Sequence, residues 1–515
     1  MKTIYLSLLA ICLAAPAAAQ LEQYFEREIP VATSEITAAR FSNDGRLLVY
    51  GTKEGRLFIW DLSTAALIGE MDHHKGKVNA LVFDAADRYL VSGADDKNIV
   101  VWDLQTREPL TVIKDFKSAL KQLNLSPNGK FLAACGGGKE IFLWDFPSGH
   151  FRGKLTGHGK DVVFCAFNER SDQVVSVGGD RKIIVWDAGT LQPVRQYEVA
   201  VHTLANSGNE ISSAVLSADR RFLAIGVEEH VLAKGSERME FRYHTAFYNW
   251  PDGTLLKVLQ GNDCVLDKLS LTPDMTYLLT DNSTLHDSRV TFWDILGGVA
   301  EKNNPIDGKI TAFDLSLDGK WLAVGIAGKG SGKESTLALW KIQGIGAYTP
   351  VAEATLAPVA DASFGGKVSL TGPAEPLIPS GQPRVLAVMY LEPLGIDSGV
   401  ARFITEDIES RLVNNCPDVK VVERNQIDQI VRELRYVQSG LTETQAIEIG
   451  RHLAAAYLMI GSVQKMGHDL SITVKLVSVE TSAIVGTRGV ICTNASMRDI
   501  FDMVSVLAPT IAKLK

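Results

Sequence analysis

The stretch Ser92–Asp103, SGADDKNIVVWD, combines a tight polar turn with a short apolar run that ends in Trp-Asp. The same ending recurs, and four tryptophans follow one another at intervals of 42 residues: Trp60, Trp102, Trp144 and Trp186. Three more continue the series at intervals of 64, 43 and 47 residues: Trp250, Trp293 and Trp340. A period of this length indicates a repeat architecture, and the sequence predicts seven units.

Each unit alternates short apolar runs with turns rich in Asn, Asp and Gly, such as SNDGR, SPNGK and SLDGK. Turns of this composition join antiparallel strands, so each unit is expected to form a small antiparallel sheet. The repeats resemble the WD40 family, whose units form the four-stranded blades of a β-propeller. The resemblance implies an all-β, seven-bladed propeller over residues 22–346.

The WD40 resemblance also implies a hydrogen-bonded tetrad of His, Ser, Asp and Trp within a blade. Two units carry all four residues: His74, Ser92, Asp96 and Trp102 in the second, and His158, Ser176, Asp180 and Trp186 in the fourth. In the first and third units Glu54 and Gly138 replace the aspartate. Such a network satisfies buried polar groups and fixes blade geometry, so we expect a structural and not a catalytic role.

Two segments resemble the outer strand that would close the ring, Arg27–Thr33 and Thr349–Leu356. Seven blades need only one, and we expect the N-terminal segment, since joining the two ends leaves no long edge strand exposed. The fifth unit carries an insertion that contains His230 and His244. Without a third ligand at metal spacing, two histidines make a weak metal site.

The N-terminus has the pattern of a secretory signal peptide over residues 1–19, with Lys2, an apolar core and small residues before Gln20. Cleavage is expected between Ala19 and Gln20. Cys12 does not stand in a lipoprotein box, because the preceding residue is not small. We therefore expect an exported protein of a Gram-negative bacterium, periplasmic or secreted, with no transmembrane span in the mature chain.

Residues 347–383 hold six of the 18 prolines, among Ala and Gly, which predicts a semi-extended linker that lets the flanking domains move. Residues 384–515 alternate strand and helix patterns, so the sequence predicts a multidomain protein with a C-terminal α/β domain built on a mixed sheet. Within this domain Thr442 and Gln445 have the spacing of a capping box at the start of a helix.

Three stretches of this region resemble the periplasmic α/β domain of the curli secretion channel CsgG: VVERNQIDQIVRE, SGLTETQAIEIGRHLAAAYLMIGSV and LVSVETSAIVG. The same domain type occurs in the flagellar protein FlgO, and a similar fold occurs in the TolB N-terminal domain and in lipoprotein activators of peptidoglycan synthases. The resemblance implies docking onto an envelope assembly, peripheral association with the outer membrane and homo-oligomers formed through this domain. Pore formation is disfavoured, since the connections are too short to line a barrel.

Removing Cys12 from the six cysteines leaves five. Cys135 and Cys165 lie in apolar, strand-like runs, where a buried and unreactive thiol is expected. Cys416 and Cys492 share the C-terminal domain. The sequence leaves open whether these two form a disulfide, because it does not give their separation.

No motif for a catalytic set, a metal or a nucleotide is found, so neither enzymatic activity nor a cofactor is expected. A net charge of -8 without any run of Lys and Arg disfavours nucleic acid as a partner. Glu423 and Arg424 follow a predicted strand, and we interpret them as a helix-terminal acid and a surface ion pair.

The leading hypothesis is a non-enzymatic, exported scaffold that binds protein partners of a cell-envelope, secretion or surface-appendage assembly. One alternative is a ligand-binding or enzymatic propeller that uses its central channel. A second alternative is a subunit of a CsgG-like outer-membrane complex.

Overall fold

The computed structural model describes these residues: 22–30, 34–114, 116, 120–199, 210–232, 239–250, 253–262, 264–282, 288–327, 335–343, 368–371, 373–378, 384–416, 419–434 and 442–512. The expected signal peptide, its cleavage site at Ala19 and Gln20, and the alternative closing segment Thr349–Leu356 lie outside the described residues.

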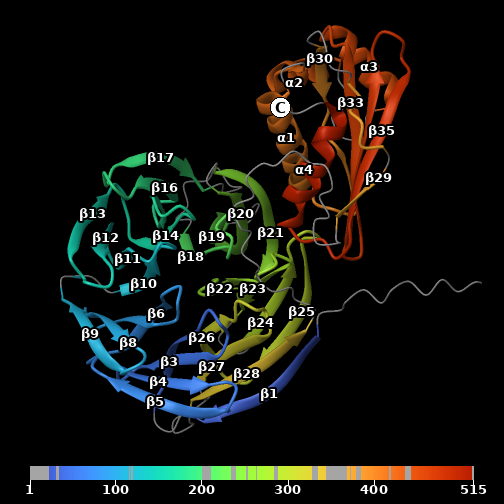
Figure 1. Ribbon diagram of the computed structural model, residues 1–515. Helices are drawn as coiled ribbons and strands as arrows, with labels where there is room; N and C mark the ends of the chain where they lie inside the picture. Colours follow the sequence, from blue (N-terminus) through green and yellow to red (C-terminus); the bar gives the residue numbers. More distant parts are fainter. Residues whose placement is uncertain are drawn as a thin grey trace, which may run out of the picture.

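Seven four-stranded antiparallel sheets are arranged around a ring (Figure 1). Blades 1 to 3 contain β2 (Ile36–Phe41), β3 (Leu47–Thr52), β4 (Arg56–Asp61) and β5 (Ala66–Asp72); β6 (Val78–Phe83), β7 (Tyr89–Ala94), β8 (Ile99–Asp103) and β9 (Glu108–Ile113); and β10 (Leu120–Leu125), β11 (Phe131–Gly136), β12 (Glu140–Asp145) and β13 (Phe151–Thr156).

Blades 4 to 6 contain β14 (Val162–Phe167), β15 (Gln173–Gly178), β16 (Lys182–Asp187) and β17 (Pro193–Glu198); β18 (Glu210–Leu216), β19 (Phe222–Leu232), β20 (Met239–Asn249) and β21 (Thr254–Asn262); and β22 (Leu269–Leu271), β23 (Tyr277–Asp281), β24 (Ser288–Asp294) and β25 (Val299–Ile306). Blade 7 contains β26 (Lys309–Leu315), β27 (Trp321–Ala327), β28 (Thr336–Gln343) and β1 (Glu22–Pro30). The predicted seven-bladed propeller is therefore confirmed.

The ring is closed by the N-terminal strand β1, which pairs antiparallel with β28 along its whole length. Ile29 of β1 is 1% exposed and packs in the apolar cluster that joins blade 7 to blade 1. The prediction that the N-terminal segment supplies the closing strand is confirmed. Strand β1 thus completes the sheet of blade 7. Opening the ring between blades 7 and 1 would expose the apolar surfaces of both blades to water.

Neighbouring blades are joined by side chains that accept hydrogen bonds from the next inner strand. Asp314 Oδ2 in blade 7 accepts from the backbone N–H of Phe41 in blade 1 (2.8 Å). In the same way, Asn124 Oδ1 in blade 3 accepts from the N–H of Phe167 in blade 4 (3.0 Å). These bonds pair backbone groups that would otherwise be buried without a partner between blades.

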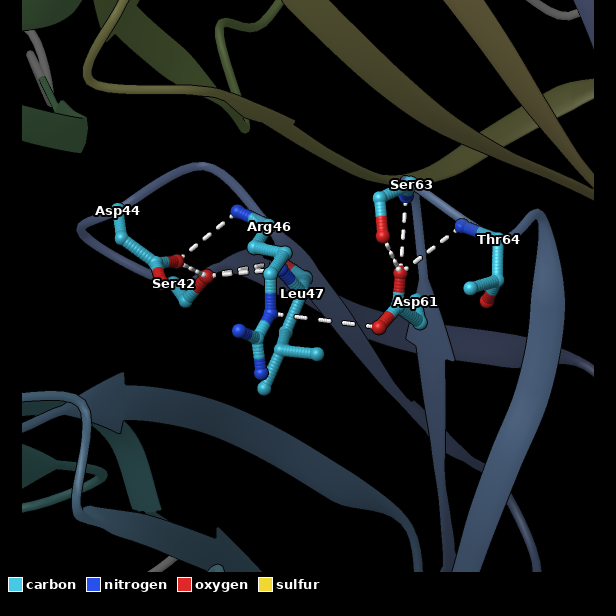
Figure 2. Close-up of polar contacts among 7 residues, drawn as sticks. All are labelled: Ser42, Asp44, Arg46, Leu47, Asp61, Ser63 and Thr64. Carbon is cyan, nitrogen blue, oxygen red and sulfur yellow. Dashed lines mark hydrogen bonds and ion pairs between the residues drawn. The ribbon is translucent and has the colours of Figure 1, made fainter.

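The Ser-x-Asp turns seen in the sequence close the hairpins between the first and second strands. Figure 2 shows the turn of blade 1, where Ser42 Oγ donates to Asp44 Oδ1 (2.6 Å) and accepts from the N–H of Leu47 (2.8 Å). The same contact recurs between Ser316 and Asp318 in blade 7 (2.6 Å). Short polar side chains that bond their own backbone are the usual means of fixing such turns.

The aspartate that follows a blade tryptophan fixes the next turn. Asp61 Oδ1 accepts from the backbone N–H groups of Ser63 (2.9 Å) and Thr64 (3.0 Å), as Figure 2 shows. Asp187 accepts from Thr190 in the same way (2.7 Å). The Trp-Asp repeat therefore encodes both a core side chain and the turn that leads to the outer strand.

The two complete tetrads form hydrogen-bonded chains. In blade 4, Trp186 Nε1 donates to Ser176 Oγ (2.8 Å), Ser176 Oγ contacts His158 Nε2 (2.7 Å), and His158 Nδ1 contacts Asp180 Oδ1 (2.9 Å). In blade 2 the corresponding distances, among Trp102, Ser92, His74 and Asp96, are 2.8, 2.8 and 3.1 Å. Burial lowers the pKa of both histidines, which favours the neutral imidazole.

The remaining blade tryptophans serve as core side chains. The indole N–H groups of Trp60, Trp144 and Trp250 are buried and have no hydrogen-bond acceptor among the described residues. In blade 6, Trp293 Nε1 donates to Thr280 Oγ1 (3.1 Å), a shortened network that the sequence reading did not identify. In blade 7, Trp340 packs at the edge of the apolar cluster.

The C-terminal domain is a mixed sheet with the strand order β29-β35-β34-β33-β30-β32, and β31 pairs with β33. Its elements are β29 (Val368–Thr371), β30 (Arg384–Val388), β31 (Glu392–Leu394), α1 (Ser398–Asn415), β32 (Val419–Val421), α2 (Arg424–Glu433), α3 (Glu443–His452), β33 (Tyr457–Met466), β34 (Asp469–Ser478), β35 (Ile484–Cys492) and α4 (Asp499–Ile511). The predicted mixed sheet is confirmed, and Thr442 and Gln445 form the predicted capping box.

Helices α1 and α4 pack on one face of this sheet and α2 and α3 on the other, each pair with its own apolar cluster. The sheet begins before Arg384, because β29 lies within the range 347–383 that was predicted as linker. Strand β29 pairs antiparallel with β35, and the nearby Ile378 N–H donates to the carbonyl of Ile511 (2.9 Å). Backbone pairing, which composition does not report, places this part of the segment in the domain.

Replacing Ser176 by Ala should lower the free energy of unfolding by about 2 kcal/mol, because the Trp186 N–H and His158 Nε2 both lose their buried partner. Urea denaturation followed by circular dichroism measures the change. The exposed turn residue Ser148 provides a control, and its replacement by Ala should cost less than about 0.5 kcal/mol. Equal effects at the two positions would contradict a structural role for the tetrad.

Candidate protein-interaction domain and its junction with the propeller

Arg424 fastens three elements of the C-terminal domain together. It is the first residue of α2, and its Nη1 donates to the carbonyl of Val388 at the end of β30 (2.8 Å). Its Nη2 pairs with Glu409 of α1, and its guanidinium lies 4.1 Å from the centre of the Tyr390 ring. Its partner is thus Glu409 and not the adjacent, exposed Glu423, so the expected surface ion pair is replaced by a contact between elements.

A second guanidinium, that of Arg402, lies on the exposed side of the cluster formed by Arg424, Glu409 and Tyr390. Arg402 lies 5.3 Å from the centre of the Tyr390 ring and donates from Nε to Glu406 Oε1 (2.8 Å), and its side chain is 63% exposed. Burial raises the pKa of Glu409 to about 7, against the opposing effect of Arg424. Arg and Tyr side chains are enriched at the centres of protein interfaces, so this group is a candidate contact for a protein partner.

The α2/α3 face of the sheet leaves part of β34 and β35 uncovered. Leu470 and Ile472 of β34 point into the α1/α4 cluster, so the alternating residues Ser471 and Thr473 lie on the opposite face, where they are partly exposed. Ile491 of β35 pairs with Ser471 and is 40% exposed. We call Ser471, Thr473 and Ile491 the open face.

The α1/α4 side of the domain packs against blades 5 and 6 of the propeller (Figure 1). The ring of Phe501 in α4 lies 5.8 Å from the ring of Phe222 in blade 5 and 5.5 Å from the ring of Phe403 in α1. The guanidinium of Arg221 lies 5.3 Å from the centre of the same ring. Buried residues of both domains therefore belong to one continuous apolar cluster.

Helix α1 approaches the propeller closely because its second residue is a glycine. A Cβ atom on Gly399 would lie 2.2 Å from the carbonyl oxygen of Leu256 in β21, closer than real contacts allow. The carboxylate of Asp397 caps the helix by accepting from the N–H of Gly399 (2.9 Å). Any larger side chain at position 399 would push the helix away from the blade.

Charged groups are also buried at this junction. Lys465, from the hairpin of β33 and β34, forms an ion pair with Asp294 of blade 6, and their side chains are 9% and 5% exposed. Lys257 of β21 is buried and donates to the carbonyl of Leu296 (3.0 Å). Breaking a buried pair by removing one partner is strongly destabilising, so this contact fixes the orientation of the domains. Buried contacts between the two domains were not predicted from the linker composition.

The other residues singled out in the sequence do not assemble into a chemical site. His230 contacts Glu228 (2.9 Å), and His244 lies elsewhere in the hairpin of β19 and β20. The described residues contain no group of three His, Cys, Asp or Glu that could hold a metal. Within the described part of the chain Cys416 and Cys492 are thiols, as are Cys135, Cys165 and Cys264.

None of the helices in the described residues is long and apolar enough to cross a membrane. The residues that make the junction were not identified from the sequence. Phe501 stands among the apolar residues of α4, and nothing in that sequence pattern distinguishes a contact within the domain from a contact with the propeller.

Replacing Phe501 by Ala should separate the unfolding of the two domains, because its ring links apolar residues of both. Differential scanning calorimetry of the wild type is expected to give one main transition, and the variant two, with a loss of about 3 kcal/mol at the junction. Phe151, which is 40% exposed on blade 3, is the matched control, and its replacement by Ala should leave one transition. Two transitions in the wild type would contradict the shared core.

The junction should also show a characteristic pH dependence. Burial lowers the pKa of Lys257 to about 8 in the folded protein, below its value in the unfolded chain, despite nearby Asp397 and Asp294. The unfolded state then binds more protons between about pH 8 and 10, so stability should rise across that range as Lys257 loses its proton. The contribution of Lys257 is the difference between the free energies of unfolding of the wild type and the Lys257→Met variant, each measured in urea across this pH range. A difference that does not vary with pH would contradict it.

Comparison with known families supports both parts of the architecture. Residues 25–61, 66–103, 107–145 and 149–187 match the family "WD domain, G-beta repeat". Residues 399–486, within the C-terminal domain, match the family "Peptidoglycan-synthase activator LpoB". Comparison with curated proteins gives no match. The likeness to CsgG and FlgO stays a prediction. The chain thus carries WD40 repeats, in a seven-bladed β-propeller, followed by an LpoB-type α/β domain.

Proposed function

We propose that this chain is an exported, non-enzymatic protein-binding protein of the bacterial cell envelope. In this proposal the LpoB-type domain binds a peptidoglycan synthase in the periplasm, and the propeller holds a second protein close to it. The observation that carries the proposal is the match of residues 399–486 to an activator family, in a domain that is packed against a propeller.

The arrangement of the surfaces supports this division of roles. The propeller covers part of the α1/α4 side of the domain, whereas the open face and Arg402 remain accessible. A partner bound there would be held at a set position relative to the propeller, because buried charge and apolar contacts fix the junction. A fixed arrangement raises the effective concentration of one bound protein near the other.

A protein-binding role also agrees with the chemistry of the described residues. The histidines of the tetrads are committed to structural hydrogen bonds, and Glu409, whose pKa lies near 7, is paired with Arg424. Export rests on the signal-peptide pattern of residues 1–19 and on the family match.

The test is site-specific photo-crosslinking in the source bacterium, with the photoreactive residue placed at Thr473 on the open face, at Arg402, or at Phe151 on the propeller. Crosslinked proteins are identified by mass spectrometry. A peptidoglycan synthase should be captured from Thr473 or Arg402 and not from Phe151. Capture of other proteins only, or of a synthase only from Phe151, would contradict the assignment.

Replacing Arg402 by Glu should weaken binding of the purified synthase at least about tenfold, since exposed Arg at an interface centre is a frequent energetic hot spot. The matched control is Arg152→Glu on the propeller, which should leave the affinity unchanged. Circular dichroism verifies that both variants fold. Equal affinities for Arg402→Glu and the wild type would remove this group from the proposed interface.

A further inference from the structure

Two cysteine thiols meet at the boundary between blades 3 and 4. Cys135 lies in β11 and Cys165 in β14, both are 0% exposed, and both belong to the apolar cluster between the two blades. The neighbouring Cys135 side chain and burial together raise the pKa of the Cys165 thiol well above its ordinary value. Two cysteines of neighbouring blades therefore lie in one buried cluster.

The backbone around the pair is held in place by Gln122 of β10. Gln122 pairs with Cys135 in the ladder of β10 and β11, and its Oε1 lies 3.9 Å from Cys135 Sγ. The same oxygen accepts from the backbone N–H of Cys165 (2.9 Å). One amide side chain, that of Gln122, thus contacts both cysteines and links their two strands.

We propose that Cys135 and Cys165 form an inter-blade disulfide when the chain folds in an oxidising compartment. The proposal rests on the export that forms part of the proposed function, since disulfides persist in the periplasm and are rare in the cytosol. Each thiol loses one proton and one electron as the S–S bond forms. The electrons reduce the disulfide of a thiol–disulfide oxidant, such as a periplasmic oxidase or oxidised glutathione, to two thiols.

The bond must form before the two blades finish packing, because thiols with no exposed surface are inaccessible to an oxidant afterwards. Once formed, it would cross-link two sheets of the ring and restrict the unfolded chain between them. Cys416 Sγ contacts the carbonyl of Ala512 (3.9 Å) and Cys492 Sγ that of Thr493 (3.7 Å), both within the C-terminal domain.

The experiment starts from the mature full-length chain, produced in a reducing cytoplasm, unfolded in urea and refolded in a glutathione redox buffer. After denaturation and alkylation, intact mass spectrometry counts the reacted thiols and peptide mapping locates any bridge. We expect two fewer alkyl groups than in the fully reduced chain, with the bridge between Cys135 and Cys165. The Cys135→Ser variant should form no bridge, whereas the control Cys264→Ser should keep it.

Alkylation of every thiol after refolding in the redox buffer, or a bridge between any other pair, would overturn the proposal. A second arm examines the chain isolated from the envelope fraction of the source bacterium. The same bridge in that sample supports the proposal. If the bridge forms in the redox buffer but is absent from the envelope sample, the proposal that it forms in the cell fails, and so does the proposed export. If only synthase binding fails, the bridge should still be found.

Discussion

The packing of α1 and α4 against blades 5 and 6 is the contact on which the rest of the architecture depends. Phe501 joins the apolar residues of both domains, Gly399 lets α1 approach the blade, and Asp294 and Lys465 bury opposite charges beside it. Apolar contacts stabilise the junction but do not select one orientation of the domains. A buried ion pair does, because its two charged groups must meet in one geometry. Together they make a propeller and an α/β domain one body with defined exposed surfaces.

Much of the propeller could be predicted from the sequence because its determinants are local. A blade repeats a tryptophan, the aspartate that turns the chain after it, and a Ser-x-Asp turn before it, as Ser42 and Asp61 illustrate. Each of these features acts within a few residues of the chain, so its position can be predicted from residue spacing alone. The closing strand β1 could be predicted for a different reason, since an open ring would leave two exposed edges.

The contacts that could not be predicted are those between segments far apart in the chain. Arg424 was read with its neighbour Glu423, yet its partner is Glu409 on another helix. Strand β29 was not predicted, because it lies in a proline-rich segment. Its strand conformation depends on backbone pairing with β35, which composition does not reveal. Cys135 and Cys165 were taken as separate buried thiols, since they become neighbours only when two blades pack together.

The central claim is that the junction holds the two domains in one orientation. Measuring the distance between two spin labels by double electron–electron resonance tests this claim most directly. Labels attached at Ser148 on the propeller and Thr487 on the C-terminal domain, both exposed, would report the inter-domain distance in a Cys264→Ser background. The account predicts a single narrow distribution that broadens when Phe501 is replaced by Ala. A broad distribution in the chain with an intact junction would contradict it.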